Sequence, residues 1–162
     1  MCSTGYASSC YPSLTFFPFV IIIKRDGRHP QWMRDYFRSL YPEGRKLSAK
    51  AFLATEQRIP GLGNGVLQDI LWDAGIDPRF SMRDAKEEDF KILYLSVKKI
   101  IRKMCEAGGR DTESDIFGTP GGYVTRLSPK SINEPCMKCG SMIHRANYMG
   151  GTVYFCEKCQ RR

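Results

Sequence analysis

The sequence predicts a mainly α-helical protein that ends in a small four-cysteine β-hairpin. Two observations carry this prediction. Apolar residues recur at helical spacing on both sides of a glycine-rich turn near the middle of the chain. Two C-x2-C pairs then lie near the C-terminus and flank a stretch with the composition of a hairpin. The 162 residues, 42% of them hydrophobic, are enough for one domain or two small ones with a buried core.

Charge and cysteine usage narrow the class of protein. The net charge is +8 and the sequence pI is about 9.2. This excess favours an anionic partner, nucleic acid before a membrane, although many basic proteins bind nothing acidic. Four of the seven cysteines have metal spacing, whereas Cys2, Cys10 and Cys105 form no pattern. We therefore expect a reducing, cytoplasmic compartment.

The first thirty residues contain an apolar run, residues 14–23, that precedes a basic stretch. The run is too short to span a bilayer. A secretory signal would carry its positive charge before the run, so the order here is reversed. A buried strand and a disordered leader explain this composition equally well, and residues 1–30 stay unassigned.

Two helices are expected before the central turn. A short one covers residues 32–37 and is broken by residues 41–44. The next covers residues 47–58, with Phe52 on its inward face and Lys50 outside that face, and Pro60 ends it.

The central turn, residues 59–65, holds three glycines and one proline, which exclude regular helix. A short helix with apolar spacing begins at Val66 and closes at Gly75. Backbone N–H groups in such a turn, beside a helix N-terminus, form a site for a phosphate. A tight turn without a ligand is the simpler interpretation of these residues alone, and Asn64 suits either because it tolerates left-handed backbone.

A long helix then starts near Asp84 and keeps its apolar period to Met104, and Gly108 and Gly109 stop it. Its lysines and arginines are most simply a solvated face, with phosphate contact as the less favoured alternative. Residues 110–134 are polar and rich in glycine, which indicates either a mobile surface loop or one that closes over a ligand.

The cysteine pairs have the spacing C-x2-C-x16-C-x2-C, which is typical of a zinc site. Each pair offers two thiolates from one tight turn, and four cysteines leave no open position on the metal. We therefore expect one structural zinc; chance pairs or disulfides are a distant alternative. The predicted ligands are Cys136, Cys139, Cys156 and Cys159.

The order of these segments resembles the C-terminal half of the formamidopyrimidine-DNA glycosylase/endonuclease VIII family, over residues 47–160. The shared order is helix, P-G-L-G-N turn, short helix, D-A-G-I-D-P, long helix ending in G-G, and four-cysteine ribbon. The resemblance implies a mainly α fold, a helix–two-turn–helix bundle over residues 31–125, followed by a zinc finger over residues 130–162. It also implies a monomer that binds lesion-bearing or abasic double-stranded DNA in base-excision repair.

Family roles carry over to matching positions only. Asn64, flanked by Gly63 and Gly65, matches the phosphate-binding asparagine, and Lys50 matches a lysine that contacts the DNA backbone. The family's zinc-finger arginine falls on Gly151, and Arg145 or Lys158 are the candidates to replace it. The lesion-recognition loop falls on residues 110–123, with the candidates Arg110, Thr112, Gly121, Gly122 and Tyr123.

The start of the chain departs from the family pattern. The family's nucleophile is an N-terminal proline followed by glutamate, whereas this chain begins Met1-Cys2-Ser3-Thr4 and lacks the N-terminal β-rich domain. We therefore expect no catalytic residue here, so that this chain alone is inactive as a glycosylase or lyase. A fragment, a mis-started reading frame and a binding-only protein all fit.

A second function class is a zinc-stabilised RNA-binding module. Similar helical units occur in ribosomal proteins, and similar zinc fingers occur in some aminoacyl-tRNA synthetases. Duplex RNA would be bound by shape and 2′-OH contacts, so competition between duplex DNA and duplex RNA separates the two classes.

Overall fold

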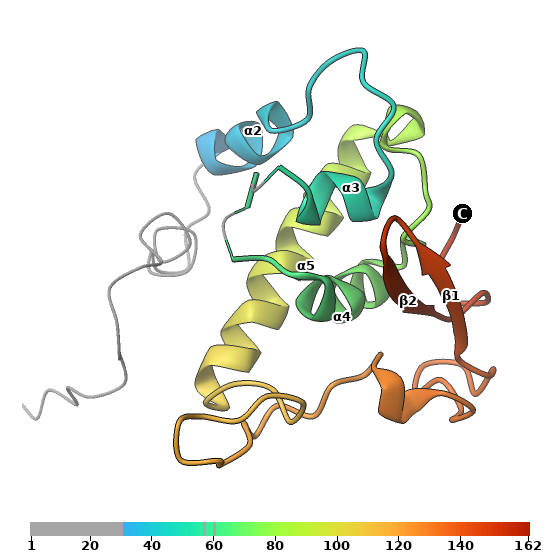
Figure 1. The fold of residues 1–162 in the computed structure, drawn as a ribbon. Coiled ribbons are helices and arrows are strands. Elements are labelled where there is room, and N and C mark those ends of the chain that lie inside the picture. Colours follow the sequence, from blue (N-terminus) through green and yellow to red (C-terminus); the bar gives the residue numbers. More distant parts are fainter. Residues whose placement is uncertain (1–30, 57, 60) are drawn as a thin grey trace, which may run out of the picture.

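The computed structural model describes residues 31–56, 58–59 and 61–162 (Figure 1). This part of the chain is mainly helical and ends in one antiparallel hairpin, as expected from the sequence. The expectations for residues 1–30 lie outside the described residues. The elements are α2 (Gln31–Ser39), α3 (Ala49–Ala54), α4 (Asn64–Ala74), η1 (Met82–Asp84), α5 (Glu87–Glu106), η2 (Pro129–Ser131), β1 (His144–Tyr148) and β2 (Gly151–Phe155).

An aromatic cluster joins α3 to α2 and α5. The ring of Phe52 on α3 lies at its centre, 5.4 Å from Phe37, 6.1 Å from Tyr41 and 5.8 Å from Phe90, measured between ring centroids. All four side chains are buried. Edge-on contacts of this kind suit the charge distribution of aromatic rings, and each buried side chain contributes about 1.5–3 kcal/mol through loss of apolar surface.

Helix α4 connects two apolar cores. Leu67, Ile70 and Leu71 are fully buried in the helical core, against residues of α3 and α5. Trp72, on the next position of the same helix, belongs instead to a second core that contains Leu127, Ile143, Tyr154 and two of the cysteines. Figure 1 shows α4 between α5 and the hairpin. One helix thus sets the position of both parts.

Local hydrogen bonds correct two predicted helix boundaries. The helix expected over residues 47–58 is the shorter α3, because the Ser48 hydroxyl caps its start by accepting from the backbone N–H of Ala51 at 3.2 Å, and Thr55 leaves helical geometry. The long helix begins at Glu87 rather than near Asp84. Its first turn is closed by Asp89, whose carboxylate accepts from the backbone N–H of Lys86 at 2.7 Å.

Lys50 lies outside the apolar face that α3 packs into the helical core, but it is not exposed to solvent. Lys50 is 5% exposed, because the hairpin tip covers this side of α3. A flank of a short helix that looks exposed in sequence becomes buried when a distant segment packs on it.

The hairpin pairs His144 with Phe155 at one end and Tyr148 with Gly151 at the other. Its two turn residues both have positive φ, 49° at Met149 and 70° at Gly150, which is the geometry of the common two-residue hairpin turn. The predicted hairpin is therefore confirmed. Among the described helices, none combines the length and the apolar run needed to cross a bilayer.

Candidate nucleic-acid interface and metal centre

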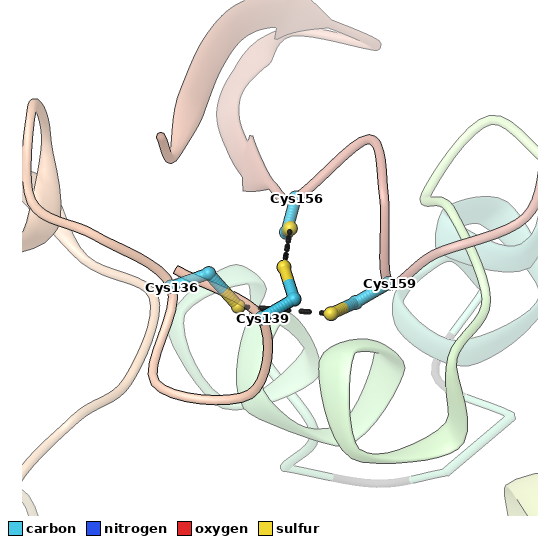
Figure 2. Close-up of side chains that lie close together, drawn as sticks. All are labelled: Cys136, Cys139, Cys156 and Cys159. Carbon is cyan, nitrogen blue, oxygen red and sulfur yellow. Dashed lines mark hydrogen bonds between the residues drawn. The ribbon is translucent and has the colours of Figure 1, made fainter. Parts of the chain in front are cut away.

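The four predicted cysteine ligands converge in one cluster. Their Sγ atoms all lie within 4.8 Å of one another, and Figure 2 shows the four side chains pointing inward from two turns. The Sγ of Cys139 lies 3.5 Å from that of Cys156, and the Sγ of Cys136 lies 3.8 Å from that of Cys159. Four thiols at this separation are a donor set suited to a metal ion.

Each pair of cysteines is held by a tight turn. The backbone N–H groups of Cys139 and Gly140 both donate to the carbonyl of Cys136, and Gly140 has a φ of 72°, a conformation that favours glycine. The second turn repeats the pattern, because the backbone N–H groups of Cys159 and Gln160 donate to the carbonyl of Cys156. The C-x2-C spacing therefore fixes the direction of two thiols at a time.

A tryptophan from the helical part completes the surroundings of the cluster. The indole N–H of Trp72 donates to the Sγ of Cys136 at 3.3 Å. Burial disfavours the Cys136 thiolate, but this indole and the backbone N–H groups of Lys138 and Cys139 stabilise it, so the pKa of Cys136 is lowered. A lowered pKa favours the form that binds metals.

Two polar side chains, missed by sequence reasoning, fasten the cysteine turns to the end of α4. Buried Gln160 accepts from the backbone N–H of Cys156 at 2.8 Å and donates to the carbonyl of Ile76 at 2.9 Å. The ammonium of Lys138 donates to the carbonyl of Trp72 at 2.7 Å, where the negative end of the helix dipole favours a cation. Neither residue stands out in the sequence as other than a polar loop residue.

The hairpin tip packs on the N-terminal ends of α3 and α4, where two predicted phosphate-binding residues meet. The ammonium of Lys50 donates to the carbonyl of Tyr148, and the side-chain amide of Asn64 donates to the carbonyl of Thr152 at 2.9 Å. A Cβ at Gly151 would lie 3.3 Å from the Lys50 Nζ and 3.6 Å from the Asn64 Nδ2. Lys50, Asn64 and the hairpin tip therefore form one group.

Burial lowers the pKa of Lys50, because the charged amine is partly removed from water. The amine therefore carries a desolvation cost that a bound anion would offset. A cavity lined by Asn147, Tyr148, Met149, Gly150, Gly151 and Thr152 lies at the hairpin tip.

Gln68 holds β2 to α4 and was not predicted. It is 2% exposed; its amide donates to the carbonyl of Thr152 at 3.1 Å and its carbonyl accepts from the backbone N–H of Tyr154 at 3.1 Å. The one feature of the sequence that could have indicated a buried role for Gln68 is its position as a polar residue between apolar positions of a short helix.

The glycines at the start of α4 have different surroundings. Gly63 is exposed and precedes the helix, which begins at Asn64 itself. Gly65 lies under the guanidinium of Arg110: a Cβ there would be 2.8 Å from the Arg110 Cζ. The absence of a side chain at Gly65 thus brings the loop after α5 to the first turn of α4.

The remaining loop candidates are spread between surface and core. Thr112 and Gly122 are exposed, whereas Gly121 packs against Gly109 too closely for any Cβ. Tyr123 is buried, and its hydroxyl donates to the carboxylate of Asp69 at 3.0 Å.

The tip of this loop is apolar and exposed, although sequence reasoning did not select it. Ile116 is 92% exposed and Phe117 is 84% exposed. The carboxylate of Asp115 holds the tip by accepting from the backbone N–H groups of Phe117 and Thr119, both at 2.9 Å.

Asp69 is the second unpredicted residue on α4. This carboxylate is fully buried and accepts from the backbone N–H groups of Arg126 at 3.0 Å and Leu127 at 2.8 Å, in addition to Tyr123. Burial raises the pKa of Asp69 despite these bonds, and the adjacent carboxylate together with burial raises the pKa of Tyr123. Asp69 thereby ties the segment between the loop and the cysteines to α4.

Arg145 does not join the group at the hairpin tip. It is exposed on β1 and pairs with Tyr154, three strand positions from the pair of Tyr148 and Gly151, which is roughly 10 Å along a strand. Lys158 is exposed within the second cysteine turn.

No family model matches the chain. Curated relatives do match: the formamidopyrimidine-DNA glycosylase of Prochlorococcus marinus is 34% identical over 93% of this chain and 55% of its own length. The glycosylase of the same name from Pectobacterium carotovorum is 31% identical over 73% of this chain and 45% of its own length. The chain thus spans about half the length of the curated relatives it matches.

Solved structures share the fold. The MutM (Fpg) protein of Thermus thermophilus has a TM-score of 0.71 at 23% identity, covering 88% of this chain and 55% of its own. The complex between the Lactococcus lactis Fpg (MutM) and a Fapy-dG containing DNA has a TM-score of 0.66 at 25% identity, over 80% of this chain and 47% of that one. A complex of the Lactococcus lactis Fpg with an abasic site containing DNA has a TM-score of 0.67 at 24% identity, over 80% and 47%.

Proposed function

Because the chain belongs to the formamidopyrimidine-DNA glycosylase/endonuclease VIII family, we propose that it binds damaged duplex DNA as the DNA-binding part of a base-excision repair glycosylase. Two of the similar solved structures are complexes with abasic-site DNA and with Fapy-dG containing DNA, which supports a lesion-bearing or abasic duplex as the partner. The net charge of +8 supports a polyanion.

The observation that carries this proposal is the meeting of Lys50, Asn64 and the hairpin tip. A partly buried ammonium, a side-chain amide and the first turn of α4 lie together at the hairpin tip, which comes from a segment about ninety residues later in the chain. A DNA phosphate would supply the negative charge that the Lys50 ammonium and the helix N-terminus both favour. We propose that α3, α4 and the turn between them form the helix–two-turn–helix unit, with its phosphate site at Asn64.

We further propose that the four cysteines hold one structural zinc ion. Tetrahedral zinc with bonds of about 2.3 Å to sulfur places its ligands roughly 3.8 Å apart, which fits the separations of 3.5 and 3.8 Å in the cluster. Four thiolates fill the coordination sphere, so this zinc would fix the hairpin rather than activate a substrate. Residues 31–125 and 130–162 would then act as a helical unit and a zinc-finger unit.

Competition between nucleic acids tests the proposal. The purified zinc-bound chain is mixed with a fluorescent duplex that carries an abasic-site analogue, and unlabelled competitors of equal length are added at one salt concentration. We expect the same DNA duplex to compete best, undamaged DNA less well and duplex RNA least. Equal or better competition by duplex RNA would contradict DNA binding and support the RNA-binding alternative.

A further inference from the structure

We propose that Arg110 is a further phosphate-binding residue at the first turn of α4. In the absence of DNA its guanidinium is paired with the carboxylate of Glu113, and a DNA phosphate replaces that carboxylate on binding. The inference rests on the proposed DNA binding and extends it. It also changes the role expected for Arg110 from the sequence, from a contact with the lesion to a contact with the backbone.

The position of the guanidinium is set by Gly65. A Cβ built at Gly65 would lie 2.3 and 2.6 Å from the two terminal nitrogens of Arg110, which is closer than real contacts allow. The terminal nitrogens of the guanidinium therefore point at the first turn of α4, at the residue that follows Asn64. Any residue larger than glycine would displace it.

This position is electrostatically incomplete without an anion. The N-terminus of a helix carries partial positive charge, so a cation placed there is unfavourable on its own. Lys50 adds a second cation near Asn64, at the hairpin tip, where a Cβ at Gly151 would lie 3.3 Å from its Nζ and 3.6 Å from the Asn64 Nδ2. Two cations and a helix N-terminus around one asparagine are the surroundings that bind a phosphate.

The partner that Arg110 has in the described structure is a weak substitute. The side chain of Arg110 is 13% exposed, and its Nε is buried without an acceptor among the described residues. One terminal nitrogen donates to the carboxylate of Glu113, whose side chain is 65% exposed on the loop three residues later. A mostly solvated carboxylate is easily exchanged for a phosphate, because it regains its hydration when it leaves.

A double-mutant cycle distinguishes this role from a structural one. The affinity of the zinc-bound chain for an abasic-analogue duplex is measured for the wild type, Arg110→Gln, Glu113→Gln and the double variant, with circular dichroism to confirm folding. If Glu113 competes with the phosphate, Glu113→Gln binds more tightly than wild type and Arg110→Gln binds more weakly. The gain from Glu113→Gln must disappear when Arg110 is already Gln.

Two matched variants control for net charge. Arg102→Gln and Glu106→Gln make the same charge changes at exposed positions of α5. The slope of log affinity against log salt should fall by about 0.9 in Arg110→Gln and less in Arg102→Gln. If Arg110→Gln and Glu113→Gln both weaken binding, the ion pair between Arg110 and Glu113 serves only to stabilise the loop, and the inference is wrong. If the gain from Glu113→Gln persists in the double variant, it is a general charge effect and the inference is also wrong.

The test separates this inference from the proposed function. A wild-type chain that does not bind duplex DNA removes both. If the wild type binds and Lys50→Ala weakens binding but Arg110→Gln does not, the proposed function stands. Arg110 is then not part of the phosphate site.

Discussion

The indole nitrogen of Trp72 lies 3.3 Å from the Sγ of Cys136, so a helix of the apolar core donates a hydrogen bond directly to a predicted metal ligand. The same indole ring lies 4.3 Å, centroid to Nζ, under the ammonium of Lys138, between the two cysteines of that turn. Because Leu71 beside it is fully buried in the helical core, the orientation of the cysteine cluster follows from the packing of α4.

We therefore predict that Trp72→Phe weakens metal binding without unfolding the helices. The variant keeps an aromatic ring but loses the N–H group that stabilises the thiolate. Loss of such an outer contact typically costs about tenfold or more in metal affinity. Competition with a chromogenic zinc chelator measures the change. An affinity equal to that of the wild type would mean that the indole contributes packing alone.

Removal of a cysteine ligand is expected to have a local effect. Cys139→Ser or Cys156→Ser should lose the bound zinc and unfold the hairpin, since metal binding of this kind is folding free energy. The helical part has its own core and should keep its circular dichroism signal. Elemental analysis of freshly purified, reduced protein should give one zinc per chain for the wild type and for the control Cys105→Ser. A wild type without zinc would remove the metal assignment.

Asp69→Asn is predicted to destabilise the segment that joins the loop to the cysteine cluster. One oxygen of the amide can still accept from the backbone N–H groups of Leu127 and, at 3.2 Å, of Arg126. Its NH2 group, however, replaces the oxygen that accepts from the Tyr123 hydroxyl and from Arg126 at 3.0 Å, so these donors lose an acceptor. An unsatisfied buried donor costs about 1–3 kcal/mol in free energy of unfolding. Chemical denaturation measures the loss, with the exposed Asp84→Asn as the control.

The pH dependence of the same variant has a defined sign. Burial raises the pKa of Asp69 above the ordinary value of 3.8, so the folded chain holds a proton that the unfolded chain releases above that pH. The free energy of unfolding of the wild type, minus that of Asp69→Asn, should therefore fall as pH rises from about 3.8 to the raised pKa. A difference that grows with pH over this window would show that the hydrogen bonds outweigh burial.

Local patterns in the sequence predicted the helices, the hairpin and the cysteine cluster. The reason is that each depends on neighbours in the chain: apolar spacing for α4 and α5, and the turn geometry of C-x2-C for the metal ligands. The helix limits were less accurate, because Ser48 and Asp89 close their turns through side-chain bonds that several residues could have made.

Contacts between distant segments were not predictable in this way. The burial of Lys50 depends on a carbonyl ninety-eight positions later in the chain. Gln68 and Asp69 look in sequence like the polar side of a short helix, and they are buried only because β2 and the segment between the loop and the cysteines pack on them. The contact of Arg110 with Gly65 likewise depends on the path of a loop that periodicity does not describe. The roles of these residues can be recognised only from the folded structure.

The most direct test of the account is the salt dependence of DNA binding by Lys50→Ala. If the Lys50 ammonium meets a phosphate beside Asn64, the variant should bind every duplex more weakly, and its slope of log affinity against log salt should fall by about one. Lys103→Ala, which removes the same charge from an exposed position of α5, should change both less. A folded Lys50→Ala chain with the affinity and salt slope of the wild type would contradict DNA binding at this turn.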